Sequence, residues 1–258
     1  MNRRAQIGID RRIDIEWLDA IAARSAAGDP VDAIRTAMWE LLDGVVAGDG
    51  NDSARRKTIT VLMKAWAMPG SPSAPLRMKA AGLLPNATRT ERLALHWAIL
   101  IASYPLFMDV ADSVGRISGF HDQFGSAQVT KRMIGLWGDR STLIRATQRI
   151  ISSMAQWGAL RHIEGAHGYE PVGPSPIRPE YGLVLVHALL LDSTSGSIQL
   201  KTIASLPALF PFSVGKMAQA IARDQAFEIH RQGFGDDVVE LRNTRQAVSA
   251  GAPAVARP

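Results

Sequence analysis

The chain has 258 residues, no cysteine and a formal net charge of +5, from 29 basic and 24 acidic side chains. Its length allows one large or two small domains, and an apolar content of 47% is ample for a core. The lack of cysteine excludes a disulfide framework and thiolate chemistry, and the charged residues 1–12 lack the apolar core of a signal peptide. We therefore expect a cytoplasmic protein.

Residues 1–85 are predicted to form a helical N-terminal domain. Apolar side chains recur at helical spacing over successive stretches of this region. The third predicted helix begins at Ser53 and carries Arg55, Arg56 and Lys57 in its first turn, where positive charge opposes the helix dipole. We interpret this basic triplet either as an ordinary solvated turn or as a set of secondary phosphate contacts.

The most apolar run, residues 93–110, contains His96 and Pro105 among other interruptions, so it is too broken to span a membrane. Two buried helices that meet at Pro105 explain it better. The second of these would be the first helix of a unit that spans residues 86–173. No convincing strand pattern precedes residue 159, and we expect no membrane contact.

The stretch from residue 126 to residue 172 has the order helix, tight turn, longer helix and hairpin. Its second helix, residues 141–157, carries one apolar stripe at helical spacing, and Gly158 ends it. This is the order of a winged helix-turn-helix, whose second helix enters the major groove of DNA. The predicted fold class is mainly α, a helical N-terminal domain followed by two winged helix-turn-helix units with short β-hairpin wings.

The excess positive charge is confined to the middle of the chain. Residues 61–179 carry 13 basic and 7 acidic side chains, whereas the preceding residues carry 9 and 10 and the following residues 7 and 7. Between Lys131 and Arg161, six basic residues stand against Asp139 alone. A positive patch on a helix-turn-helix pattern is the electrostatic footprint of nucleic-acid binding. We therefore expect double-stranded DNA as the partner.

The outward face of the helix at 141–157 holds hydrogen-bond formers and no carboxylate. A solvated face is the competing interpretation, but solvated helices usually mix charges of both signs. The predicted DNA-binding residues are Lys131, Arg132, Arg140, Ser141, Thr142, Arg145, Gln148, Arg149, Ser152, Arg161, His162 and His167.

The predicted roles of these residues follow from their positions. Residues 140–142 stand at the start of the helix, where phosphate is favoured. Arg145, Gln148 and Arg149 are placed to reach base edges, arginine towards guanine and glutamine towards adenine. The basic pair at residues 131–132 would hold phosphate, and the three hairpin residues would lie near the backbone or the minor groove.

The same order of elements recurs after a proline-rich linker, and we interpret residues 180–243 as a second winged-helix-like domain. Its expected elements are a helix over 181–191, a strand over 197–200, a short helix over 201–206, a helix over 213–223 and a hairpin formed by 227–231 and 238–241. Asp236 and Asp237 at the hairpin tip would repel phosphate. We therefore expect this unit to mediate a homodimer or to bind a protein, and residues 244–258 to be disordered.

No catalytic, cofactor or metal site is predicted. The spacing of His162, Glu164, His167 and Glu170 matches no metal motif. Phosphate-loop, dinucleotide-binding and nucleophile-elbow motifs are absent from the sequence. Most of the tryptophans lie at positions of the apolar stripes, so we expect them in the core rather than in a stacking platform. The chain is expected not to be an enzyme.

Three patches carry a family resemblance: the basic helix start at residues 53–57, the Tyr-Pro-Leu-Phe-Met-Asp run at residues 104–109 and the helix-turn-helix up to Leu160. In this order they resemble BrxA, the small accessory protein of the BREX bacteriophage-defence systems. The resemblance covers about residues 30–165, and the region after residue 180 departs from the family pattern. It implies an all-helical protein with winged-helix elements that binds DNA without being an enzyme, with other defence-system proteins as further partners.

The sequence thus predicts a non-enzymatic DNA-binding accessory factor of a bacterial phage-defence system, which contacts DNA through the helix at 141–157 and the hairpin at 160–172. The alternative is a protein-interaction scaffold or a transcriptional regulator that uses its winged helices for assembly.

Overall fold

The computed structural model describes residues 6–68, 73–164, 168–231 and 237–242, and in this part the chain is mainly α-helical, as predicted. The α-helices are α1 (Ile15–Ala26), α2 (Val31–Leu41), α3 (Ala54–Trp66), α4 (Ala74–Leu83), α5 (Arg89–Ser103), α6 (Pro105–Ser118), α7 (Ser126–Trp137), α8 (Ser141–Gln156), α9 (Pro179–Asp192) and α10 (Ala218–Arg223). The 3₁₀ helices are η1 (Leu84–Asn86), η2 (Leu200–Ser205) and η3 (Pro207–Leu209). The strands are β1 (Leu160–His162), β2 (Tyr169–Pro171), β3 (Ser175–Pro176), β4 (Ser197–Gln199), β5 (Phe212–Ser213), β6 (Phe227–His230) and β7 (Val238–Leu241).

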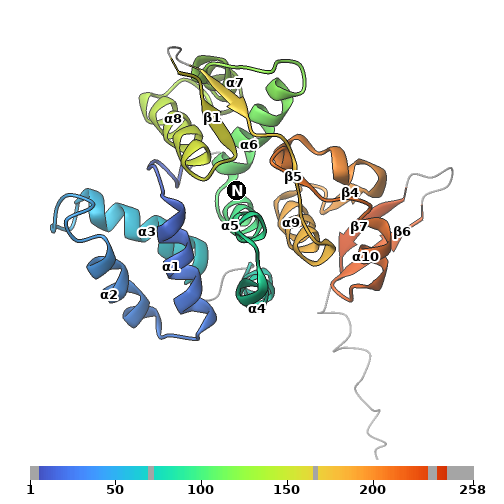
Figure 1. The fold of residues 1–258 in the computed structure, drawn as a ribbon, viewed down its shortest axis with the longest axis horizontal. Coiled ribbons are helices and arrows are strands. Elements are labelled where there is room, and N and C mark those ends of the chain that lie inside the picture. Colours follow the sequence, from blue (N-terminus) through green and yellow to red (C-terminus); the bar gives the residue numbers. More distant parts are fainter. Residues whose placement is uncertain (1–5, 69–72, 165–167, 232–236, 243–258) are drawn as a thin grey trace, which may run out of the picture.

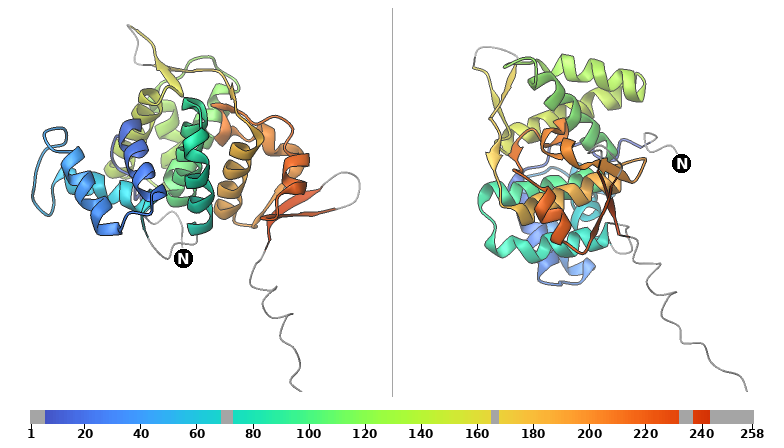
Figure 2. Two further views of the ribbon diagram at one scale, coloured as in Figure 1. Left: turned by 60° about the horizontal axis from the view of Figure 1, so that its bottom comes forward. Right: turned by 90° about the vertical axis from the view of Figure 1, so that its right-hand side faces the viewer.

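Helix α5 lies in the middle of the molecule, with the other parts arranged around it (Figure 1). The helices α1–α3 lie on one side, α6–α8 with the β1–β2 hairpin lie at the top, and α9 and α10 with the C-terminal strands lie on the other side. A second orientation again shows α5 between the N-terminal and C-terminal parts (Figure 2). Every residue of α5 from Leu93 to Ile101 is buried, so neighbouring elements cover it on all sides.

Helix α9 is the main neighbour of α5 on the C-terminal side. Its residues from Tyr181 to Leu190 are all buried, and a helix that is apolar all round belongs in the interior of a protein. At the centre of this packing, Trp97 of α5 donates from Nε1 to the carbonyl oxygen of Ala208 at 2.9 Å. Its ring lies edge-on to Trp157 and Phe212, from parts of the chain far apart in sequence.

The buried apolar side chains form one cluster that runs from Ile9 to Val239. The predicted units at 1–85, 86–173 and 180–243 therefore share a core within the described residues. Among the described glycines, Gly115 of α6 has the closest neighbour, because a Cβ atom there would lie 1.9 Å from the carbonyl oxygen of Pro207. The predicted disordered tail, residues 244–258, lies outside the described residues.

The segment from α6 to β2 has the predicted order of two helices, a tight turn, a third helix and a hairpin. Strands β1 and β2 are antiparallel, with Arg161 opposite Glu170. Phe124, in the loop between α6 and α7, forms a further antiparallel bridge with Tyr169 of β2. The order across this small sheet is therefore Phe124, then β2, then β1.

The C-terminal sheet repeats this order, because β4 pairs with β7 and β7 pairs with β6. In both sheets the first extended segment, Phe124 in one and β4 in the other, therefore lies beside the last strand, which is β2 or β7. The predicted helix over 213–223 is wrong in its first half, since α10 begins at Ala218. Phe212 and Ser213 instead form β5, which pairs with β3 in parallel, and Gly215 at φ +59° prevents a continuous helix.

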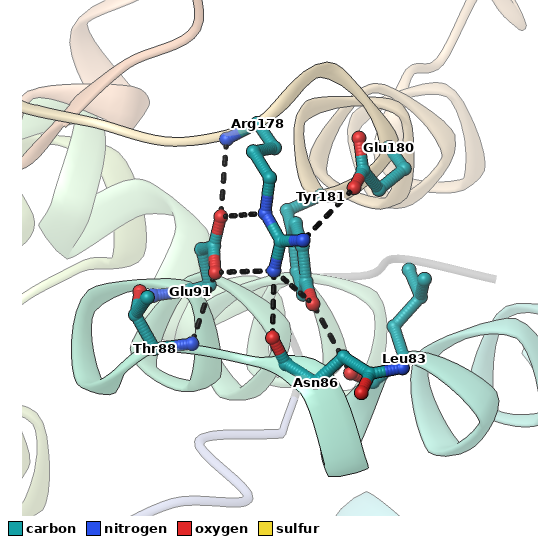
Figure 3. A network of polar contacts seen from close by, with 7 residues as sticks. All are labelled: Leu83, Asn86, Thr88, Glu91, Arg178, Glu180 and Tyr181. Atoms are coloured by element: carbon teal, nitrogen blue, oxygen red, sulfur yellow. Dashed lines mark hydrogen bonds and ion pairs between the residues drawn. The ribbon is translucent and has the colours of Figure 1, made fainter.

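A polar network joins the start of α5 to the start of α9 (Figure 3). The Glu91 carboxylate accepts hydrogen bonds from Nε and Nη2 of Arg178 at 2.7 and 2.9 Å and from the backbone N of Thr88 at 2.9 Å. The Thr88 side chain accepts from the backbone N of Glu91, so Thr88 caps α5 in a capping box. Arg178 also donates to the hydroxyl of Tyr181.

The hydrogen bonds from Arg178 lower the pKa of Glu91 from its usual 4.5 to about 2. A carboxyl whose pKa falls on folding stabilises the folded state above its unfolded pKa, and this contribution disappears as the pH falls through the folded pKa. The stability that Glu91 confers is therefore fully present above pH 4.5 and is lost between pH 4.5 and about 2.

We expect Glu91→Gln to lower the free energy of unfolding by about 2–3 kcal/mol at pH 7, because buried hydrogen bonds to charged groups are removed. Urea unfolding at several pH values measures this, and the difference from the wild type should shrink below pH 4.5. Glu180→Gln is the matched control, since Glu180 lies 3.6 Å from Arg178 and is 43% exposed. Equal destabilisation by both variants would contradict this role of Glu91.

Candidate nucleic-acid interface

Helix α8 forms because its apolar residues fall on one face and glycines bound it. Leu143, Thr147, Ile150 and Met154, all predicted to lie inward, are at most 1% exposed. Gly138 and Gly158 have φ values of +80° and +83°, which allow the turns before and after the helix. The preceding residue, Arg140, is extended and gives the helix no side-chain cap.

The outward face of α8 carries Arg145, Gln148 and Arg149, which are all exposed, as are Ser141 and Thr142 at its start. The sequence of α8 contains no carboxylate. Among the described residues, no acidic side chain forms an ion pair with Arg145 or Arg149. The predicted cationic face is thus present on the surface of this helix.

The N-terminal segment covers the second half of α8, which the sequence did not indicate. The backbone N of Ile13 donates to Ser153 Oγ at 2.8 Å, and Trp157 Nε1 donates to the carbonyl oxygen of Ile13 at 2.9 Å. Gln156 accepts from the backbone N of Ile15 and donates to Glu16. The accessible part of α8 therefore runs from Ser141 to about Arg149.

Arg149 lies at the border of this covered region. Its guanidinium donates to the backbone carbonyl oxygen of Asp10, although the residue remains exposed. Ser152, one turn before Gln156, is half-buried. These two residues are therefore less available to a ligand than Arg145 and Gln148.

The predicted phosphate contacts before α8 are on the surface. Lys131 and Arg132 are exposed on α7, whose buried residues include Val129 and Met133. Arg140 is exposed and donates from Nη2 to the carbonyl oxygen of Trp137 at 3.0 Å, which holds it at the turn between the two helices.

The hairpin residues are more constrained than predicted. Arg161 is 73% exposed but forms an ion pair with Glu170, its neighbour on the opposite strand. His162 is exposed and lies edge-on to Tyr169, with ring centroids 5.2 Å apart. His167 lies outside the described residues. The hairpin therefore adds less free positive charge than its sequence suggested.

Two members of the basic triplet at the start of α3 form ion pairs with the preceding loop, and the third has a neutral hydrogen-bond partner there. Arg55 pairs with Asp43 at 2.6 Å and with Asp49 at 3.0 Å, and Lys57 pairs with Asp52 at 2.8 Å. Arg56 donates to Asn51. Each of the three side chains thus has a partner in the preceding loop, which favours the interpretation as an ordinary surface turn; secondary phosphate contacts at Arg55, Arg56 and Lys57 stay a prediction.

Comparison with known proteins gives no relative: no family model matches the chain, and neither a curated protein nor a solved structure matches it. Among the described residues, no group of three potential metal ligands lies together, and no helix has the length and apolar character that a bilayer span requires.

We expect Ser153→Ala to loosen the N-terminal segment from α8, because the buried backbone N of Ile13 loses its acceptor. The cost is about 1–3 kcal/mol of unfolding free energy for an unsatisfied buried group. Urea unfolding and amide hydrogen exchange at Ile13 measure the effect. Ser152→Ala is the matched control, because the structure gives that half-buried hydroxyl no role in holding the segment. If Ile13 kept its protection in Ser153→Ala, the Ser153 hydroxyl would not hold the segment.

Proposed function

We propose that this protein is a non-enzymatic binder of double-stranded DNA, with the first half of α8 in the major groove. The observation that carries the proposal is the exposed face of Arg145, Gln148 and Arg149 on a helix without carboxylates. Such a face attracts the phosphate backbone, and arginine and glutamine side chains reach guanine and adenine edges.

The topology around α8 supports a winged helix-turn-helix assignment. Helices α6, α7 and α8 are followed by the β1–β2 hairpin, and Phe124 adds a third extended segment beside β2. The middle and last helices are joined by a three-residue turn at residues 138–140. In this class of motif the second helix of the pair reads the groove while the first crosses the DNA backbone.

The roles of the individual residues follow from their exposure. Arg145 and Gln148 are the base-reading residues, because they are exposed and lie away from the N-terminal segment. Arg149 contacts DNA at the edge of the helix, beside Asp10. Phosphates are held by Lys131 and Arg132 on α7 and by the start of α8, where backbone N–H groups and the helix dipole favour anions. Arg161 and His162 make secondary contacts from the hairpin.

The C-terminal unit is proposed to serve assembly, either as a homodimer contact or by binding another protein. Its sheet order β4, β7, β6 parallels that of the first unit, but its last helix, α10, has 6 residues against 16 in α8. So short a helix presents little surface to a groove. The role in phage defence, and partners from such a system, rest on the resemblance to BrxA.

We expect the double substitution Arg145→Ala and Gln148→Ala to weaken binding to duplex DNA by about 2–6 kcal/mol, since each base contact contributes roughly 1–3 kcal/mol. Fluorescence anisotropy with a labelled duplex of mixed sequence measures the affinity. Arg35→Ala, which removes an exposed arginine of α2, is the charge-matched control. Wild-type affinity in the double variant would exclude α8 as the DNA-binding helix and leave a scaffold function.

We expect Lys131→Ala with Arg132→Ala to weaken binding to all sequences alike and to reduce the slope of log K against log salt by about 2, one for each phosphate that is no longer neutralised. Titrations at several salt concentrations give the slope. An unchanged slope would show that α7 does not contact the DNA backbone.

A further inference from the structure

An open cavity of about 600 Å³ lies at the surface between α1, η1 and α5, and five of the eight residues that line it are exposed. Helices α1 and α5 lie side by side in both orientations (Figures 1 and 2). Most of the wall is apolar, formed by Ala20, Ala23, Ala26, Ala27, Leu84 and Pro85. Two charged side chains, Asp19 of α1 and Arg92 of α5, complete it. An apolar cavity with a few convergent polar groups is the usual form of a small-molecule site, and none of these residues belongs to the candidate DNA surface.

The Asp19 carboxylate is held in place by a histidine behind it. His96 is fully buried, and its Nε2 lies 2.9 Å from Asp19 Oδ1. Because an ionised carboxylate is an acceptor alone, Nε2 carries the proton and donates it. Burial lowers the pKa of His96, so the ring is neutral at pH 7. The Asp19 side chain itself is 34% exposed and faces the cavity.

Asp19 is charged at neutral pH. Partial burial alone would raise its pKa, but the hydrogen bond from His96 and the positive charges of Arg92 and Arg89 outweigh that effect, and the pKa is lowered. The wall of the cavity therefore presents a fixed negative charge, in an orientation that a buried ring determines.

The Asp19–His96 pair is an unfavourable way to join two helices. His96 Nδ1 is buried without a hydrogen-bond partner among the described residues, next to the edge-on ring of Trp66. An unsatisfied buried polar atom destabilises the folded state, and apolar side chains at these positions would avoid that penalty. The hydrogen bond does, however, hold the Asp19 carboxylate in a fixed position. A specific contact with a charged ligand group requires such a fixed position.

Arg92 supplies the opposite charge on the facing helix. It stands one turn before His96 on α5, and its charge acts on Asp19. In the described part of the chain the two side chains form no ion pair with each other, so the carboxylate and the guanidinium can each meet a ligand group of opposite charge. A ligand with one charge alone would be attracted by one of them and repelled by the other.

We propose that this cavity binds a small zwitterion, an α-amino acid with a large apolar side chain. Its ammonium group pairs with Asp19, its carboxylate pairs with Arg92, and its side chain lies on the alanine wall of α1 and on Leu84 and Pro85. The proposal is independent of DNA binding, because it involves a different set of residues.

Isothermal titration calorimetry of the full chain with L-leucine and L-phenylalanine tests the proposal. We expect saturable binding of at least one of them, and weaker binding of leucinamide, which lacks the carboxylate, and of isocaproate, which lacks the ammonium group. Arg92→Gln should weaken binding roughly tenfold to a hundredfold, because a charge-assisted hydrogen bond to the ligand carboxylate is removed. Arg35→Gln, on the exposed side of α2, should bind as the wild type does.

A second variant separates loss of ligand binding from loss of the fold. Asp19→Asn also disturbs His96, so Ala23→Leu, which narrows the cavity from α1 and keeps both members of the pair, is compared with it. We expect both to lose binding and Ala23→Leu to keep the wild-type unfolding temperature. Absence of saturable binding by the folded wild type up to about 10 mM, or wild-type affinity in Arg92→Gln, would overturn the proposal. Neither result would change the measured affinity for DNA.

Discussion

The structure depends on the burial of α5 between the N-terminal helices and α9. This helix begins with a hydrogen-bonded carboxylate, Glu91, and continues as an apolar rod that neighbouring elements cover. Arg178, just before α9, completes the hydrogen bonding of Glu91 and so fixes where the second long buried helix begins. Because a buried carboxylate without its cation is strongly unfavourable, this pairing favours the observed register of the two helices. Trp97 then connects the same pair to η3, which holds Ala208.

The surface that the fold leaves for the proposed DNA contact is smaller than the cationic helix itself. Residues 10–16 bind the second half of α8 through backbone and side-chain hydrogen bonds. The free part is about two turns long, which is the length that a groove-reading helix uses for its base contacts. The N-terminal segment therefore both stabilises α8 and limits which of its residues can reach a partner.

Periodicity predicted the helices well, because most of them have one apolar face and a glycine or proline at an end. It also placed the residues of α8 correctly, since Leu143, Thr147, Ile150 and Met154 lie inward. Which charged side chains form ion pairs was not predictable, because these pairs depend on contacts distant in sequence or on loop geometry. Nothing in the sequence indicated that Arg55 is paired, because Asp43 and Asp49 reach it only through the conformation of the loop before α3.

Contacts between residues distant in sequence also explain three further features that the sequence did not predict. The strand-like residue Phe124 stands alone between polar neighbours, so its bridge to Tyr169 had no signal in the local pattern. The shortening of the last C-terminal helix follows from the pairing of β5 with β3, a contact between segments more than thirty residues apart. The Asp19–His96 pair likewise joins residues on different helices, and although His96 interrupts an apolar run, nothing in the local pattern indicates Asp19 as its partner.

The close contact between Gly115 of α6 and Pro207 of η3 limits the relative motion of the two halves of the molecule, the parts before and after the proline-rich linker. A backbone carbonyl lies where a methyl group would be at this point of α6, so the halves touch without an intervening side chain and have no hinge there. A force applied to the C-terminal half would be transmitted to α6, and through it to α7 and α8, without first compressing flexible side chains. Lengthening the proline-rich connection between the halves would therefore not by itself free them from each other, because this contact and the shared apolar core would remain.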